Sequence, residues 1–141
     1  NVNQDAEIKE ERNTPYLLGV AIQIIGFIFL LIFNLSYYSL SLWLCYITNT
    51  LLIYLINRNW KISAHTTGAA VSAAFFLFFF GWELFLIFFI ITFIVGSSRI
   101  ILKVHTVKQV IAGGIFGFVV TYLQIYLYLN LFSENKLIKL F

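Results

Sequence analysis

The stretch Gly96–Gly117, GSSRIILKVHTVKQVIAGGIFG, places a cluster of polar and ionisable residues between two long apolar runs. Charged side chains are costly in hydrocarbon, so such a cluster at the end of a membrane helix is a candidate functional site. His105 and Gln109 are four residues apart and can touch if the segment is helical. Arg99 lies six residues before His105 and can curl back toward the same anion. A serine, an arginine and a histidine with a polar partner are what a phosphate site needs.

The composition is that of an all-α integral membrane protein. Of 141 residues, 61% are hydrophobic and only 11% are charged, whereas a soluble domain carries about 25% charged residues. The net charge of +3 is small and its cations lie in loops, so we expect no nucleic-acid partner. Cys45 is the single cysteine, which excludes an internal disulfide framework. The chain begins with Asn and contains no Met, so we expect a processed or partial product, and the presence of further helices upstream stays open.

Five apolar runs predict a bundle of about five transmembrane helices. We expect them at residues 16–33, 40–56, 62–80, 84–95 and 106–129. They form a single bundle over 15–132, preceded by a polar segment, 1–14, and followed by a short tail, 133–141. The first half of the third helix is rich in glycine, alanine and serine, and Gly113 and Gly117 recur in the fifth. Small residues let membrane helices approach closely, so we expect both stretches to pack against neighbours.

Counting the crossings assigns the polar loops to the two membrane faces. The N-terminal segment, the 57–61 loop and the 96–108 loop fall on one face, and the other two turns fall opposite. The four predicted site positions that converge on the first face are Arg12, His65, Arg99 and His105. Most of the lysines and arginines lie on that same face, which by the positive-inside rule favours a cytoplasmic site.

The polar cluster resembles the third signature of the phosphatidic acid phosphatase type 2 superfamily, a family of membrane lipid phosphatases. That signature is Ser-Arg, five residues, His, three residues, Asp. Ser98 and Arg99 are followed by His105 at this spacing, and Gln109 stands where the Asp belongs. The chain is similar to a divergent bacterial branch of the superfamily.

Two weaker matches extend the resemblance toward the N-terminus. Ile62-Ser63-Ala64-His65 keeps the serine and the histidine of the second signature, Pro-Ser-Gly-His. Arg12 and Pro15 stand in for the end of the first signature, Lys, six residues, Arg-Pro. Asp5 occupies the position of its lysine, and Lys9 is the nearest cation.

The resemblance implies a role for each polar residue and implies neither a metal ion nor another cofactor. His105 would be the nucleophile that forms a phosphohistidine, and His65 the acid that protonates the leaving lipid alkoxide. Gln109 would hold the imidazole as the family's Asp does, but without its charge. The expected phosphate ligands are Arg99, Ser98, Ser63, Arg12 and Lys61.

Three functions remain open from the sequence. The first is a phosphatase acting on an anionic phospholipid or a polyprenyl phosphate in the bilayer. The second is a catalytically weakened or inactive member of the fold, acting as a structural subunit or assembly factor with membrane-protein partners. The third is an anionic-lipid binder or transporter. The two histidines favour the first over the third, and Gln109 favours the second.

The resemblance implies a bacterial inner membrane. It also implies a site that opens to the exterior, whereas the count of positive charges favours a cytoplasmic site.

Overall fold

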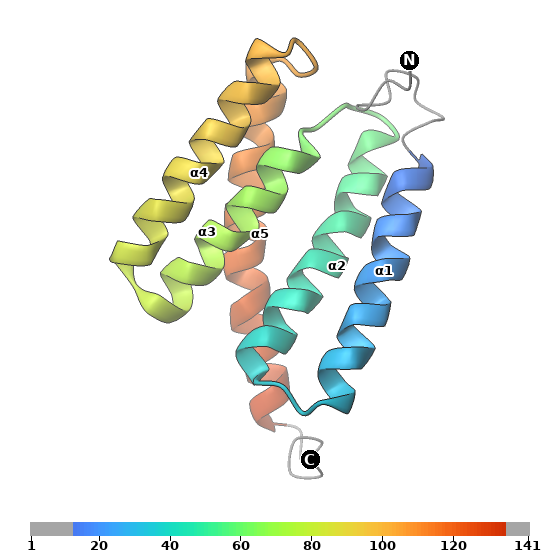
Figure 1. Cartoon of the computed structure of the whole chain (residues 1–141), viewed down its shortest axis with the longest axis vertical. Helices are drawn as coiled ribbons and strands as arrows, with labels where there is room; N and C mark the ends of the chain where they lie inside the picture. The colour runs from blue at the N-terminus through green and yellow to red at the C-terminus, as the bar shows by residue number, and fades with distance from the viewer. Residues whose placement is uncertain (1–12, 135–141) are drawn as a thin grey trace.

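The structure is a computed structural model that describes residues 13–134, and within that range it is helical, with five helices and no strand. The helices are α1 (Asn13–Ile32), α2 (Tyr37–Asn57), α3 (Ala64–Phe80), α4 (Trp82–Ile101) and α5 (Val107–Glu134). They run up and down beside one another, with α1 and α2 forming a hairpin at one side (Figure 1). The predicted all-α class is confirmed. Arg12, most of the polar N-terminal segment and most of the tail lie outside the described residues.

Four of these described helices, α1, α2, α4 and α5, are long and apolar enough to cross a bilayer. Their outer surfaces are apolar: Ile25 of α1 is 68% exposed and Phe93 of α4 is 71% exposed. In a soluble protein so many exposed apolar side chains would be a liability, whereas in a bilayer they face lipid. The protein is therefore an integral membrane protein. The helix α3 is apolar too, but its 17 residues fall short of the expected span.

Local capping explains where the chain turns before and after α3. The side chain of Asn57 holds the preceding loop, because its Oδ1 accepts the Ile62 N–H at 3.0 Å. Ser63 caps the start of the helix, because its Oγ accepts the Thr66 N–H at 3.4 Å. The helix ends at Phe80 and is followed by Gly81, which has a φ of +83°. Glycine reaches that conformation without steric cost, so one residue is enough to connect α3 to α4.

The fourth helix is longer than its predicted range of 84–95. It begins at Trp82 and continues to Ile101, so the polar stretch 96–99 is helical and does not belong to the loop. The Ser98 hydroxyl is satisfied inside the helix, where it donates to the Val95 carbonyl at 2.7 Å. The chain leaves the helix at Lys103, which has a φ of +57°. Polarity alone does not end a helix, and a lysine in the left-handed conformation is a stop that sequence rules do not indicate.

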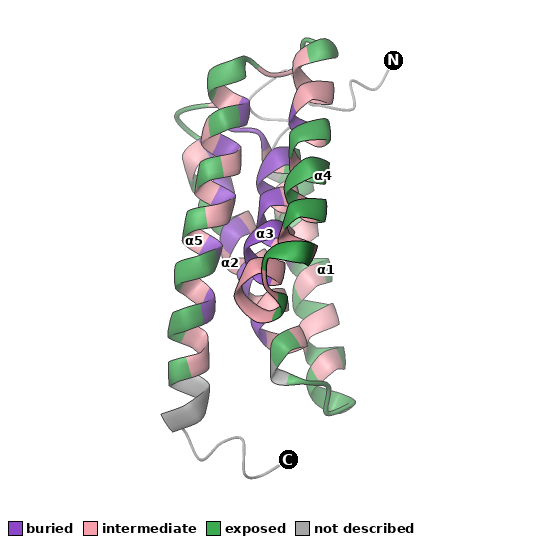
Figure 2. Cartoon of the chain, turned by 90° about the vertical axis from the view of Figure 1, so that its left-hand side faces the viewer, coloured by how far each residue is buried: buried purple, intermediate pink, exposed green. Residues whose placement is uncertain are grey.

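The helix α3 lies at the centre of the bundle and packs along both α4 and α5. Figure 2 shows the buried residues gathered on α3 and on the surfaces that face it. Ala70, Ala73 and Ala74 are among the most buried residues of the described chain. The expectation that small residues of α3 pack against neighbours is confirmed at these positions.

Two glycines bring α5 against the backbone of α3. A Cβ atom on Gly113 would lie 2.7 Å from the Ser63 carbonyl oxygen, and one on Gly117 would lie 2.5 Å from the Thr67 carbonyl oxygen. No side chain fits at either position, so the two backbones are in direct contact. The predicted close-packing face of the fifth helix is confirmed, and it is the feature that fixes α5 relative to the start of α3.

The α1–α2 hairpin joins the other helices through α2. Inside the hairpin, the Trp43 indole lies over Gly26 and donates to the Gln23 carbonyl. Between α2 and α5, the Asn49 amide donates to Thr121 Oγ1 at 2.8 Å, and both residues are fully or almost fully buried. A hydrogen bond between buried polar groups in the middle of two membrane helices specifies their register.

Candidate active site

Three helix ends meet at one end of the bundle: the start of α3, the end of α4 and the start of α5 (Figure 1). The Ser63 N–H donates to the Gln109 main-chain carbonyl at 3.3 Å, which joins α3 to α5. The His105 N–H donates to the Arg99 carbonyl at 3.3 Å, which folds the loop after α4 back onto its last turn. These two bonds bring Ser63, Arg99, His105 and Gln109 together from three segments of the chain.

The loop between α4 and α5 is short and internally bonded. The Arg99 carbonyl accepts two N–H groups, from Val104 at 3.2 Å and from His105 at 3.3 Å. Lys103, in its left-handed conformation, donates to the Ile100 carbonyl at 2.9 Å. Backbone strain at a non-glycine residue persists where the surrounding bonds determine the conformation, and it is common at functional sites. The main-chain bonds of the loop therefore place the backbone of His105 beside that of Arg99.

Thr106 and Gln109 form a capping box at the start of α5. Gln109 Oε1 accepts the Thr106 N–H at 3.0 Å, and Thr106 Oγ1 accepts the Gln109 N–H at 3.4 Å. The reciprocal pair satisfies two of the N–H groups that lack partners at a helix start. The Gln109 side chain is therefore fixed by the helix itself.

The same Gln109 oxygen lies 3.1 Å from His105 Nδ1. Because the Thr106 N–H can only donate, the Gln109 atom that faces it must be the amide oxygen and not the nitrogen. An oxygen can only accept from the imidazole, so Nδ1 carries the proton in this bond and the lone pair of the neutral ring lies on Nε2. The predicted contact between His105 and Gln109 is confirmed, and its geometry selects one tautomer.

The electrostatics of this end favour an anion. The helices α3 and α5 both begin here, and the N-terminus of a helix carries a partial positive charge. Arg99 is half-buried in the last turn of α4. Lys61 is half-buried in the connection before α3, and Lys103 and Lys108 are exposed around the loop. A group with several negatively charged oxygens would be attracted from more than one side.

The other predicted site residues lie nearby in different environments. Ser63 is completely buried, and its Oγ bonds to Thr66 Oγ1 at 2.8 Å as well as capping α3. Ser98 is tied to its own helix by the bond to the Val95 carbonyl. His65 lies in the first turn of α3 and is exposed. Arg12 is outside the described residues, and the phosphate contacts of all these side chains stay predictions.

Two residues that support the site were missed from the sequence. Thr106 carries half of the capping box, and the pattern Thr-x-x-Gln before an apolar run is the signal that could have revealed it. Asn57, at the end of α2, is 6% exposed and organises the connection that delivers Ser63 and His65. No sequence pattern distinguishes it from an ordinary loop asparagine.

Comparison with known proteins identifies a family for this chain. A family model described as the PAP2 superfamily matches residues 49–133, more than half of the chain. The matched range runs from the middle of α2 to the end of α5 and contains both histidines, Arg99 and Gln109, but not the weak first-signature match at Arg12. No curated protein and no solved structure matches the chain. The five-helix membrane bundle, with its histidine and arginine on adjoining helix ends, belongs to the PAP2 superfamily.

Proposed function

We propose that this protein is a membrane lipid-phosphate phosphatase that transfers a phosphoryl group first to His105 and then to water. The observation that carries the proposal is the Gln109 oxygen, which Thr106 holds in place and which bonds His105 Nδ1 at 3.1 Å. A histidine nucleophile must present an unprotonated nitrogen, and this arrangement makes Nε2 that nitrogen. Membership of the PAP2 superfamily supports a fold of the phosphatase type.

In the first step, His105 Nε2 attacks phosphorus and the bond from phosphorus to the lipid oxygen breaks. The electron pair of that bond leaves on the lipid oxygen, which takes a proton from His65. His65 is suited to this role because it is exposed two residues after Ser63, whose N–H is bonded to the helix that begins beside the nucleophile. The products of this step are the dephosphorylated lipid and a phosphohistidine.

In the second step, water attacks phosphorus and the bond to Nε2 breaks, which releases inorganic phosphate. His65, now neutral, takes the proton from the attacking water, so both residues return to their starting forms. Phosphoryl transfer asks the protein mainly for positioning and charge stabilisation. Arg99 and the starts of α3 and α5 would supply the charge, and the further phosphate ligands proposed are Ser63, Ser98, Lys61 and Arg12.

The proposed substrates are phosphomonoesters or diphosphates of membrane lipids, in a bacterial inner membrane with the site on its outer side. The membership of the PAP2 superfamily supports a lipid phosphate as the substrate class. The membrane-spanning helices support a substrate that approaches within the bilayer, because the ends of such helices are expected at the level of the lipid head groups.

One observation favours a second candidate, a member of the same fold that has lost most of its catalysis and serves as a subunit of a membrane complex. Gln109 supplies the hydrogen bond that fixes the tautomer, but an amide has no charge to stabilise the imidazolium and phosphohistidine stages. In a serine protease triad, replacing the corresponding carboxylate by an amide lowers kcat about 10⁴-fold, chiefly through the wrong tautomer. Here the tautomer is the right one, so we rank the phosphatase first.

Phosphate release from the purified protein in detergent tests the proposal. We expect turnover of phosphatidate or of a polyprenyl diphosphate, and its loss by roughly 10³-fold or more in His105→Asn, as for the nucleophile or base of other covalent enzymes. Leu127→Ala is the control, since Leu127 is a 56% exposed side chain toward the far end of α5. The absence of turnover in the wild type, with no phosphohistidine trapped on His105, would decide for the subunit.

The variant His65→Ala distinguishes the proposed role of His65 from that of His105. We expect it to lose activity on a lipid phosphate, whose alkoxide needs a proton, but to keep most of its activity on an aryl phosphate with a good leaving group. The measurement is kcat/KM for the two substrates at one pH. An equal loss on both substrates would remove His65 from the role of acid.

A further inference from the structure

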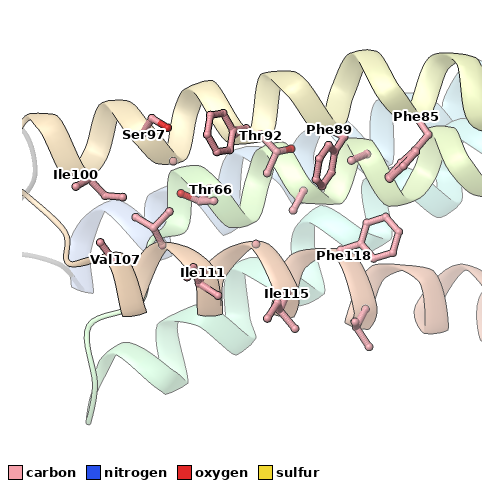
Figure 3. Close-up of a pocket in the computed structure, with 17 residues that line it drawn as sticks. Thr66, Phe85, Phe89, Thr92, Ser97, Ile100, Val107, Ile111, Ile115 and Phe118 are labelled. Atoms are coloured by element: carbon pink, nitrogen blue, oxygen red, sulfur yellow. The ribbon is translucent and has the colours of Figure 1, made fainter.

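An apolar groove lies between α4 and α5, with α3 as its floor (Figure 3). It has a volume of about 580 Å³ and an almost entirely apolar lining, in which Thr66, Thr92 and Ser97 are the only hydroxyl-bearing residues. It exists because α4 and α5 each pack along α3 but touch each other over a much smaller area. The large side chains beside it, such as Phe89 and Ile115, are more than half exposed, so the groove is open on the side that faces lipid.

The two ends of the groove differ. At one end it is lined by Ile100 and Val107, which flank the loop that carries His105 and lie next to the cationic end of the bundle. At the other end, Phe85 and Phe118 meet edge to face across the groove, with ring centroids 5.7 Å apart (Figure 3). The groove thus begins at the candidate active site and is closed by an aromatic pair deep in the membrane.

The length of the groove follows from the two helices. It extends roughly 16 Å along α5, from Val107 to Phe118, and roughly 22 Å along α4, from Ile100 to Phe85, at 1.5 Å per residue. Three bonds of an extended chain advance about 3.5 Å. An extended hydrocarbon chain that fills the groove therefore has on the order of 14 to 19 carbons.

A protein helix is a poor occupant. A helix about 10 Å across and 16 Å long fills roughly 1,300 Å³, more than twice the volume of the groove. A hydrocarbon chain is thin and apolar, and it is already present in the bilayer that surrounds the open side. Its charged head group would then lie at the end of the groove where Arg99, Lys103 and Lys108 gather.

We propose that the groove between α4 and α5 binds one hydrocarbon chain of the lipid substrate and that the Phe85–Phe118 pair limits the length of that chain. The inference rests on the proposed function for the nature of the head group. Because a chain leaves one hydrocarbon environment for another, the groove gains little from the hydrophobic effect. The groove instead selects lipids by chain length. A chain that matches the length of the groove keeps its phosphate at His105, whereas a longer chain must bend out past the aromatic pair.

A series of phosphatidates with saturated chains of about eight to about twenty carbons tests the proposal, each lipid diluted in the same detergent micelle. We expect the kcat/KM of the wild type to peak within the range set by the groove and to fall severalfold for longer chains. Phe118→Ala should move the peak to longer chains, and Ile115→Trp, which fills the middle of the groove, should move it to shorter ones. Phe33→Ala, at an exposed position in the turn after α1, should leave the profile unchanged. A profile that is the same in all four proteins overturns the inference.

A second measurement does not depend on turnover. A phosphatidate with a photoreactive diazirine at the end of one chain is crosslinked to His105→Asn, and the modified residues are identified by mass spectrometry. Labelling concentrated around Phe85 and Phe118 supports the inference. Labelling spread evenly over exposed residues outside the groove, such as Ile25 and Ile87, would mean ordinary bilayer lipid, and labelling that avoids the groove would mean that the lipid chain does not enter it; either overturns it.

The two measurements distinguish a failure of the proposed phosphatase function from a failure of the proposed chain-binding groove. Labelling of the aromatic pair without any phosphatase turnover would leave the groove in place and remove the catalytic function. Turnover that depends on His105, combined with a flat chain-length profile and dispersed labelling, would keep the function and remove the groove.

Discussion

The helix α5 meets its two neighbours in opposite ways. Toward α3 it presents Gly113 and Gly117, and the backbones touch. Toward α4 it presents Ile115 and Phe118, and the helices stand apart around a groove. The first interface fixes the start of α5 within hydrogen-bonding distance of Ser63, and with it the capping box that orients His105. Direct backbone contact positions the groups of the candidate site, whereas the absence of such contact leaves the groove for which we propose a lipid chain.

Adjacent glycines on α5 allow the sharpest test of this contrast, and the largest effect is expected from Gly113→Ala. Its Cβ would press on the Ser63 carbonyl, which cannot move without breaking the α3–α5 junction, so we expect a destabilisation of about 1–3 kcal/mol and a loss of activity. Gly114→Ala is the matched control, because its nearest neighbour, a Thr66 methyl, is 3.7 Å away. Thermal unfolding in detergent measures both, and equal stability of the two variants would contradict the backbone-contact interpretation.

The hydrogen bonds of the Gln109 side chain with Thr106 and His105 lead us to expect a gain of activity from Gln109→Glu. Glutamate at this position keeps the capping box with Thr106 and the bond to His105 Nδ1, and it adds the charge that stabilises the imidazolium. We expect kcat/KM for a lipid phosphate to rise roughly ten- to a hundredfold, in the range of acid–base contributions. Gln109→Asp restores the residue type of the family signature but is one methylene shorter than the side chain that makes both bonds, so its gain should be smaller. If Asp exceeds Glu, the capping box is not what positions this group.

The smallest effect is expected on the groove side, from Gly96→Ala. A Cβ on Gly96 would lie 2.7 Å from Val110 Cγ1, the same distance as at Gly113, but the obstructing atom is a side-chain methyl and not a backbone carbonyl. We expect a cost at the low end of overpacking, about 1 kcal/mol, with activity retained. A loss of stability as large as that of Gly113→Ala would show that α4 and α5 are held together as tightly as α3 and α5.

Much of the fold could be predicted from the sequence because the hydrocarbon core of a bilayer admits few backbone conformations. Apolar runs of sufficient length must be helical in a bilayer, and the small residues indicated that the third and fifth helices pack closely against neighbours, but not which neighbours. The bond between His105 and Gln109 was predictable from a spacing of four, since that spacing is local to one helix start. These predictions depend only on neighbours along the chain.

What could not be predicted depends on distant parts of the chain. The end of α4 is set by the backbone of Lys103 and by two N–H groups that converge on the Arg99 carbonyl, and no residue type in the loop signals either. The groove depends on how far α4 stands from α5. Phe85 and Phe118 meet there from opposite helices, although in the sequence each is one of many phenylalanines.

The shortness of α3 has a consequence for the membrane around it. Its 17 residues reach about 25 Å, whereas the hydrocarbon core of a bilayer is about 30 Å thick. With its first turn at the level of the head groups, the turn at Gly81 falls short of the opposite surface, and the exposed Trp82 and Glu83 that follow it fall short as well. Lipids beside this hairpin must shorten or tilt to let water reach the Glu83 carboxylate. Because the same hairpin forms the floor and one wall of the groove, we expect the thickness of the host bilayer to tune the protein's preference among substrates.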